Sequence, residues 1–221
     1  MTSGASALPV EGDQLCGLAW LDGLLWYSDA GLEAITAVDP VNGAVVTRLP
    51  CPGVRTGLTA ADGGTRLVQV VDGDKRLRVL EPYTGRVFEE YPNPRPGAEL
   101  CGVHDTPGGM WMGYQDPPVI DLRRHGDHEA ILSIEVNEDV ADVTVAGGSV
   151  IFANHPEARL NVLDPESGRI VRVIPVAGNP TGLTWDGRRL WYCDYSAGQL
   201  RAVEVDLDEL TAGSEDPVDP C

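Results

Sequence analysis

The sequence predicts an all-β fold, a five-bladed β-propeller with four antiparallel strands in each blade. A hairpin pattern, in which Asp-Gly joins an apolar strand to an aromatic-rich strand, stands at residues 181–194 and again at 16–29. The residues that open the inner strands recur at intervals of 40, 45, 40 and 40 residues, at Gly17, Gly57, Gly102, Asp142 and Gly182. Repeats of about 40–45 residues with several short strands are typical of propeller blades.

Each repeat continues into a turn and an outer strand. The turns combine a proline, which fixes φ, with a glycine that supplies a left-handed position, at residues 39–43, 81–85 and 164–168. The third repeat has a reduced version from Asp121 to Gly126. The outer strands end at a proline, at Pro50, Pro92 and Pro175, which an outermost strand tolerates because one of its edges is unpaired.

The fifth repeat lacks an outer strand and ends after Asp206. The segment 8–12, Leu-Pro-Val-Glu-Gly, resembles segment 174–178, Ile-Pro-Val-Ala-Gly, which belongs to the outer strand of the fourth repeat. We therefore expect the N-terminal strand to complete the last blade and close the ring, which removes an exposed sheet edge. This predicts one domain over residues 1–206, followed by an acidic, disordered tail over 207–221.

The composition bears on partners and location. The chain has 34 acidic and 16 basic residues, a formal net charge of −18. Such a surface repels phosphate groups, so we expect neither nucleic acid nor membrane as a partner, and a monomer is the default. The N-terminus shows no basic and apolar leader, which predicts a cytoplasmic protein with free thiols.

Blade geometry predicts where a small-molecule site lies. In an up-and-down blade, the loop entering strand one and the loop leaving strand two emerge at the same end, and strand one is innermost. Such a funnel is the default ligand site of this fold. The strand-one entrances are Cys16, Thr56, Cys101, Ala141 and Thr181, and the strand-two exits and neighbouring loops add Asp29, Arg55, Arg95, Glu99, Tyr114, Asn154, His155, Cys193 and Asp194.

Three cysteines converge on this end, and their chemistry stays open. Cys16 and Cys101 hold the same repeat position, and Cys193 ends a strand there. They fit simple packing, acid/base or nucleophilic catalysis beside a histidine or arginine, or binding of a soft metal such as Zn or Cu. No C-x-x-C or H-x-x-x-H spacing favours the metal, so no cofactor is firmly predicted.

The other candidate groups are carboxylates and one histidine. Glu99, Asp142 and His155, together with Cys16 and Cys101, are the candidate catalytic residues, because buried acids in a cleft titrate nearer neutral pH. The candidate ligand-binding residues are Asp29, Arg55, Arg95, Tyr114, Asn154, Cys193 and Asp194. An Asp at a strand end also commonly binds its own loop backbone, which is the structural alternative. His125 and His128 fall in an outer turn, where we expect them to be solvated.

Several blade openings share a pattern with a known family. They read Cys16-Gly17-Leu18, Thr56-Gly57-Leu58-Thr59 and Glu99-Leu100-Cys101-Gly102-Val103, and Asp142 and Asn154 hold two further matching positions. On these motifs the chain resembles the plant-type glutaminyl-peptide cyclotransferases (glutamine cyclotransferase family), which implies a five-bladed propeller. Thr56 stands where the family has an acid, and Cys16 and Cys101 replace its usual residues. We therefore expect the architecture without the cyclase reaction.

The sequence thus predicts a cytoplasmic enzyme that acts on a small polar molecule in the funnel, using thiols and carboxylates. One alternative is a propeller that binds a small molecule or a soft metal without catalysis. Further alternatives are glutamine cyclotransferase-like activity and a protein-interaction scaffold.

Overall fold

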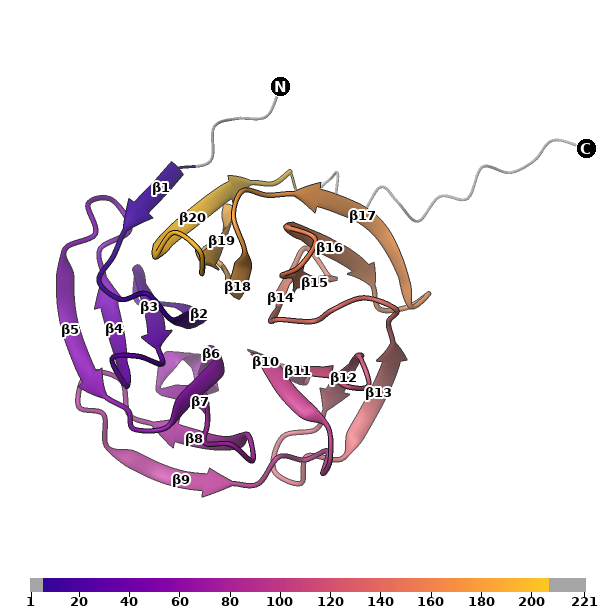
Figure 1. The fold of residues 1–221 in the computed structure, drawn as a ribbon. Coiled ribbons are helices and arrows are strands. Elements are labelled where there is room, and N and C mark those ends of the chain that lie inside the picture. Colours follow the sequence, from indigo (N-terminus) through magenta and orange to yellow (C-terminus); the bar gives the residue numbers. More distant parts are fainter. Residues whose placement is uncertain (1–5, 207–221) are drawn as a thin grey trace, which may run out of the picture.

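Five separate antiparallel sheets stand around a common axis, as the blades of a propeller (Figure 1). The computed structural model describes residues 6–206, and the predicted tail at 207–221 lies outside them. Each sheet has four strands, so the predicted five-bladed architecture is confirmed. No helix in this part of the chain is long and apolar enough to span a membrane.

The strands follow one another from the axis outwards in the first four blades. Blade one holds β2 (Leu15–Leu21), β3 (Leu24–Asp29), β4 (Ala34–Val38) and β5 (Val45–Pro50). Blade two holds β6 (Val54–Ala61), β7 (Arg66–Val71), β8 (Arg76–Leu80) and β9 (Val87–Tyr91), with a short 3-10 turn, η1 (Asp62–Gly64), after β6. Blade three holds β10 (Glu99–Thr106), β11 (Gly109–Gln115), β12 (Val119–Arg123) and β13 (Ala130–Glu135). Blade four holds β14 (Val143–Ala146), β15 (Ser149–Asn154), β16 (Arg159–Asp164) and β17 (Arg169–Pro175).

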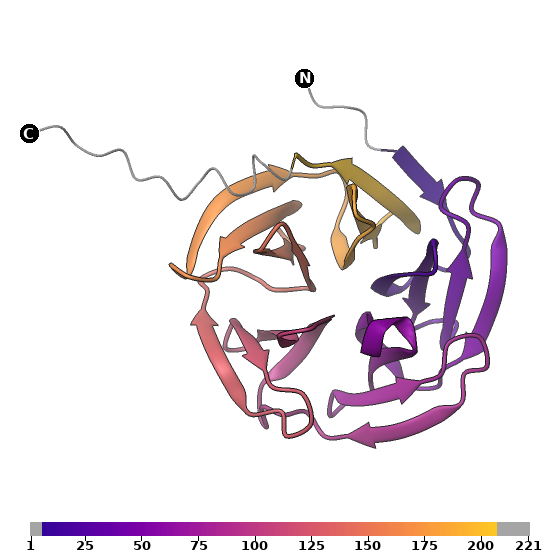
Figure 2. The ribbon, with the colours of Figure 1, turned by 180° about the vertical axis from the view of Figure 1, so that it is seen from behind.

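The fifth blade is built from both ends of the chain. It holds β18 (Pro180–Trp185), β19 (Arg189–Asp194), β20 (Gln199–Glu204) and, outermost, β1 (Ser6–Pro9). Leu8 pairs with Leu200, and Figure 2 shows β1 beside β20 at the rim. The ring is therefore closed by backbone pairing, as the sequence predicts, although β1 begins two residues before the segment expected to form it.

Glycine at the inner-strand openings lets neighbouring blades approach at the axis. A Cβ added to Gly17 would lie 2.6 Å from the backbone N of Leu58 in the next blade. A Cβ on Gly57 would lie 2.8 Å from the N of Val103. Real Cβ atoms do not come this close, so these positions need a residue without a side chain. The recurring Gly is thus a packing requirement of the channel wall.

The core fills the spaces between the sheets, where the largest fully buried side chains are aromatic. Trp26, Trp191, Tyr27, Tyr192 and Phe152 are each under 2% exposed. The outermost strands are largely exposed, as the burial of β5 and β9 shows. The packed inner strands therefore hold the loops at each end of the channel on a rigid frame.

Candidate functional site

A cavity of about 560 Å³ opens at the end of the propeller where the inner strands begin, and we call it the axial cavity. All five strand-one entrances line it. Blade geometry alone therefore identified the residues that meet there: Cys16, Thr56, Cys101, Ala141 and Thr181.

Further residues of the axial cavity come from the loops around these entrances. Of the predicted site residues, Arg55, Glu99 and His155 line the cavity beside Cys16 and Cys101. The structure does not bring the other predicted residues to its wall: Asp29, Arg95, Tyr114, Asn154, Asp142, Cys193 and Asp194. It adds residues that sequence reasoning missed, namely Gln115 at the end of β11 and Tyr195, which directly follows β19. Both lie one residue beyond the strand-two exits, so a slightly wider window around those exits finds them.

The two thiols of the axial cavity are hydrogen-bonded and protonated. Cys16 Sγ donates to the Ser28 carbonyl at 3.4 Å, and Cys101 Sγ donates to the Glu99 carbonyl at 3.5 Å. Burial raises the pKa of each thiol to about 12, and the negative charge of Asp142 adds to that effect. At neutral pH both therefore act as weak hydrogen-bond donors, since the thiolate is the nucleophilic form.

Cys193 faces the seam between blades five and one. It is fully buried, and its Sγ lies 3.8 Å from the Gly17 carbonyl oxygen. Burial raises the pKa of this thiol as well. Within residues 6–206, no group of three or more His, Cys, Asp or Glu side chains is placed to hold a metal ion. In that range the thiols of Cys16, Cys101 and Cys193 thus form no metal-binding set.

Arg55 is the charged group of the axial cavity that has no partner of its own. Its guanidinium is exposed and makes no ion pair or hydrogen bond with any residue in the described range. Glu99, in contrast, is paired with Lys75 at 3.2 Å. The cavity therefore presents one uncompensated positive charge in a strongly acidic protein.

His155 and Tyr195 form one wall of the axial cavity. Their rings meet edge to face, with centroids 6.0 Å apart. The Nδ1 atom of His155 is buried and has no hydrogen-bond partner in the protein. It is an unsatisfied polar atom in the wall of the cavity, whereas a buried polar atom is normally paired.

Asp142 lies in the channel wall and holds the blades together. Its carboxylate accepts the N–H of Leu183 at 2.7 Å and the N–H of Val143 at 2.8 Å, with a third such bond from Val103. These donors belong to blades five, four and three. Complete burial raises the pKa of this carboxyl well above its usual range. Asp142 is therefore a structural residue that joins blades three, four and five.

Asp29, Asp194 and Asn154 end the second strands of their blades and bind residues of the neighbouring loops and strands. Asp29 accepts the N–H of Gln14 at 3.0 Å and that of Leu32 at 2.7 Å. Asp194 accepts Arg201 Nε at 2.7 Å and the Asn179 N–H at 3.1 Å. Asn154 donates to Glu138 Oε2 at 2.7 Å and accepts the Glu157 N–H at 3.0 Å. Each also binds its own loop, Asp194 through the Ser196 hydroxyl at 2.8 Å, which matches the structural alternative for a strand-end polar residue.

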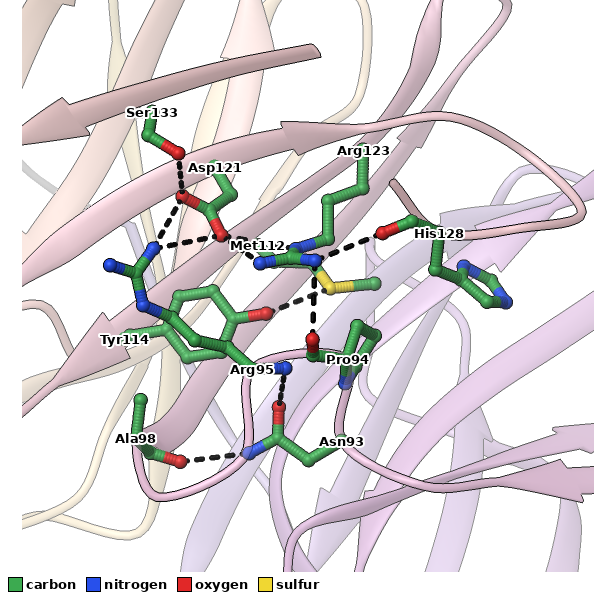
Figure 3. Close-up of polar contacts among 10 residues, drawn as sticks. All are labelled: Asn93, Pro94, Arg95, Ala98, Met112, Tyr114, Asp121, Arg123, His128 and Ser133. Atoms are coloured by element: carbon green, nitrogen blue, oxygen red, sulfur yellow. Dashed lines mark hydrogen bonds and ion pairs between the residues drawn. The ribbon is translucent and has the colours of Figure 1, made fainter. Parts of the chain in front are cut away.

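Arg95 and Tyr114 lie together in a buried polar network of blade three (Figure 3). Arg95 donates to Asp121 Oδ1 at 3.0 Å, and Arg123 binds the same carboxylate. The Tyr114 ring lies 5.8 Å from each guanidinium carbon, and its hydroxyl donates to Met112 Sδ at 3.3 Å. This network fastens the loop before β10, which explains why Arg95 and Tyr114 do not face the axial cavity.

No protein-family model and no curated protein sequence matches this chain. Among solved structures, the glutaminyl cyclase of Myxococcus xanthus is similar, with a TM-score of 0.72 and 14% identity over 93% of this chain and 97% of that one. A chain of a nidogen/laminin complex gives a TM-score of 0.61 and 18% identity over 89% of this chain and 77% of that one. Virginiamycin B lyase of Staphylococcus aureus gives 0.54 and 13%, over 87% and 66%.

Because the sequence identities are low, these likenesses show the fold alone. The neighbours include two enzymes and a chain from a protein–protein complex, so proteins with similar folds differ in function. The resemblance predicted from the blade-opening motifs is confirmed at the level of architecture. The chain is a five-bladed β-propeller whose fold is similar to that of a bacterial glutaminyl cyclase.

Proposed function

We propose that the protein binds a small carboxylate-bearing molecule in the axial cavity, with Arg55 as the group that recognises the carboxylate. The observation that carries this proposal is the unpaired guanidinium of Arg55 at the cavity, in a chain with 34 acidic and 16 basic residues. Acidic partners are abundant, yet this arginine has none within residues 6–206. A free guanidinium recognises carboxylates through two parallel hydrogen bonds.

The remaining groups of the axial cavity suit a polar ligand with an apolar part. His155 offers its unpartnered Nδ1, and Gln115 offers an amide. Tyr195 supplies an aromatic surface beside them. The volume of about 560 Å³ lies within the range of small-molecule sites.

Binding fits these residues better than the covalent thiol chemistry expected from the sequence. With a pKa of about 12, about one Cys16 thiol in 10⁵ is ionised at pH 7. Cys101 has the same raised pKa. Neither thiol has a cationic or imidazole hydrogen-bond partner that would activate it. Their proposed part is to line the cavity as weak donors.

The experiment compares carboxylates with their uncharged amides. N-acetylglycine, N-acetylglutamine and benzoate are each titrated beside the corresponding primary amide, and binding is followed by protein NMR. We expect at least one carboxylate to bind saturably. Its amide should bind about tenfold more weakly or not at all, because it loses one charge-assisted contact. Arg55→Gln should reduce binding by a similar factor.

A matched control separates the site from general charge attraction. Arg188→Gln also removes one exposed guanidinium, but Arg188 pairs with Glu204 away from the axial cavity. It should leave the dissociation constant unchanged. The proposal fails if no carboxylate binds, or if Arg55→Gln and Arg188→Gln weaken binding equally.

A second candidate function is cyclisation of an N-terminal glutamine. It is supported by the likeness in fold to the Myxococcus xanthus glutaminyl cyclase and by the Glu99 carboxylate at the axial cavity. Thr56 and Cys16, which replace the residues of the resembling family, speak against it. An assay on a glutamine-initial peptide tests it, and release of ammonia that Glu99→Gln abolishes would favour this candidate over simple binding.

A further inference from the structure

A second cavity, of about 600 Å³, lies at the opposite end of the propeller, between blades two and three. We call it the seam cavity. Strands β6 and β10 begin at the axial cavity and run towards the seam cavity, where Ala61 and Asp105 line it. Its apolar lining includes Val68 and Val79 of blade two and Met110 of blade three.

The turn between β12 and β13 reaches over the seam cavity. His125 Nε2 lies 2.8 Å from Asp105 Oδ1, and the ring of His128 stacks on Tyr91 of blade two with centroids 4.3 Å apart. Asp105 Oδ2 accepts the N–H of Asp62, which joins the turns of the two blades. His125 is half exposed, as expected of a solvated residue, but it also pairs with Asp105 of β10. His128 is half-buried and stacked on Tyr91, so the expectation that it is merely solvated is wrong.

The side chain of Arg123 holds this turn in place. Arg123 Nη1 donates to the His128 carbonyl at 2.9 Å and to the Pro94 carbonyl at 3.3 Å, and the Arg123 guanidinium is itself bound to Asp121 (Figure 3). The buried ion cluster of blade three thus fixes one wall of the seam cavity. A preformed wall lowers the entropy cost of binding a ligand.

The charge of the seam cavity is negative. Glu89 lines it, and the Glu89 carboxylate makes no hydrogen bond or ion pair within the described range. Asp62 and Asp105 add two more carboxylates. Arg66 also lines the cavity, and its guanidinium is stacked 3.7 Å above the ring of Phe88, the unpaired residue at the register shift of β9. Three carboxylates against this one guanidinium leave the lining negative.

A neutral imidazole nitrogen completes the polar lining. His128 Nδ1 is buried and has no hydrogen-bond partner in the protein. Burial lowers the pKa of His128 below its usual value, so the ring is neutral at pH 7 and one of its nitrogens accepts a hydrogen bond. An ammonium group is a matching donor for this nitrogen and for a free carboxylate.

We propose that the seam cavity is a second binding site, and that it takes a small organic amine in its protonated form. The ammonium group contacts Glu89, and the apolar body of the amine covers Val68, Val79 and Met110. A metal ion fits less well, since no three His, Cys, Asp or Glu side chains within residues 6–206 are placed to hold one. This site is independent of the carboxylate site at the axial cavity.

The test uses 2-phenylethylamine as the probe and 2-phenylethanol as its uncharged counterpart, titrated by NMR at physiological salt. We expect 1:1 saturable binding of the amine, with shifts in the ring signals of His125 and His128. 2-Phenylethanol should bind the wild-type protein at least about tenfold more weakly than the amine does. The amine should bind the Glu89→Gln variant at least about tenfold more weakly than it binds the wild type. Glu90→Gln is the matched control, because Glu90 is on the opposite face of β9 and paired with Arg78.

Two further comparisons decide the outcome. Arg55→Gln should leave amine binding unchanged, so failure at the axial cavity does not affect this result. The proposal is overturned if the amine does not saturate, if the alcohol binds as tightly, or if Glu89→Gln and Glu90→Gln have the same effect. The last result would mean that the amine is attracted only to the acidic surface.

Discussion

The carboxylate of Asp142 accepts the backbone N–H of Leu183 at 2.7 Å, and this bond crosses the seam between blades four and five. The other four blades carry glycine at the equivalent position, where close approach of neighbouring backbones excludes a side chain. Blade four instead uses a side chain as the acceptor. A buried carboxylate is tolerated there because three backbone N–H groups surround it.

Replacing Asp142 should therefore weaken the whole ring. Asp142→Ala leaves buried N–H groups from three blades without an acceptor, and each unsatisfied group costs about 1–3 kcal/mol. We expect the free energy of unfolding, measured by urea denaturation, to fall by about 3 kcal/mol or more. Asp164→Ala, in an exposed turn, is the control and should cost less than about 1 kcal/mol. Equal losses in the two variants would refute a joining role for Asp142.

The same residue predicts a dependence of stability on pH. Burial raises the pKa of the Asp142 carboxyl in the folded state above its value of 3.8 in the unfolded chain. The folded state therefore holds a proton that the unfolded state releases, so this group's contribution is full below pH 3.8 and is lost as pH rises through the folded pKa. The stability difference between the wild type and Asp142→Asn should fall with rising pH above about 4. A difference independent of pH would contradict the raised pKa.

The thiols of the axial cavity should react slowly. Cys16 and Cys101 have pKa values of about 12, so alkylation by iodoacetamide at pH 7.5 should proceed far more slowly in the folded protein than in urea. Mass spectrometry of the labelled peptides measures both rates. Cys16→Ser and Cys101→Ser should keep carboxylate binding at the axial cavity. Rapid labelling of folded Cys16 at neutral pH would show an activated thiol instead.

Ring closure by β1 is testable by truncation. Removing residues 1–9 exposes the backbone edge of β20, which now pairs with β1 along its length. We expect lower stability and self-association on size-exclusion chromatography, since an unpaired edge recruits other strands. A synthetic peptide of residues 1–12 should reverse both changes. A truncated protein with the same elution volume and the same stability as the full chain would show that the β1 pairing is dispensable.

The sequence predicts the architecture well, for a physical reason. The spacing of Gly17, Gly57 and Gly102 reports the repeated close contact of inner strands, and each repeat contains its own hairpins. The return of β1 to the last blade follows from the missing outer strand. These features depend on local pairing and on a regular repeat, both of which are visible in the chain.

The site is only partly predictable, because some side chains depend on contacts between blades. Cys16, Arg55 and His155 reach the axial cavity because strand geometry fixes their positions. Arg95 turns away to meet Asp121, and this ion pair depends on the path of the loop before β10, which the repeat does not encode. The stack of His128 on Tyr91 is likewise a contact between two blades.

The most direct test of the carboxylate site is the side-chain NMR signal of the Arg55 Nε–H group during titration with the tightest-binding carboxylate of the panel. We predict that this signal shifts and saturates with the same dissociation constant as the backbone signals around the axial cavity. A carboxylate that binds while the Arg55 signal stays unmoved would contradict the proposed recognition of the ligand.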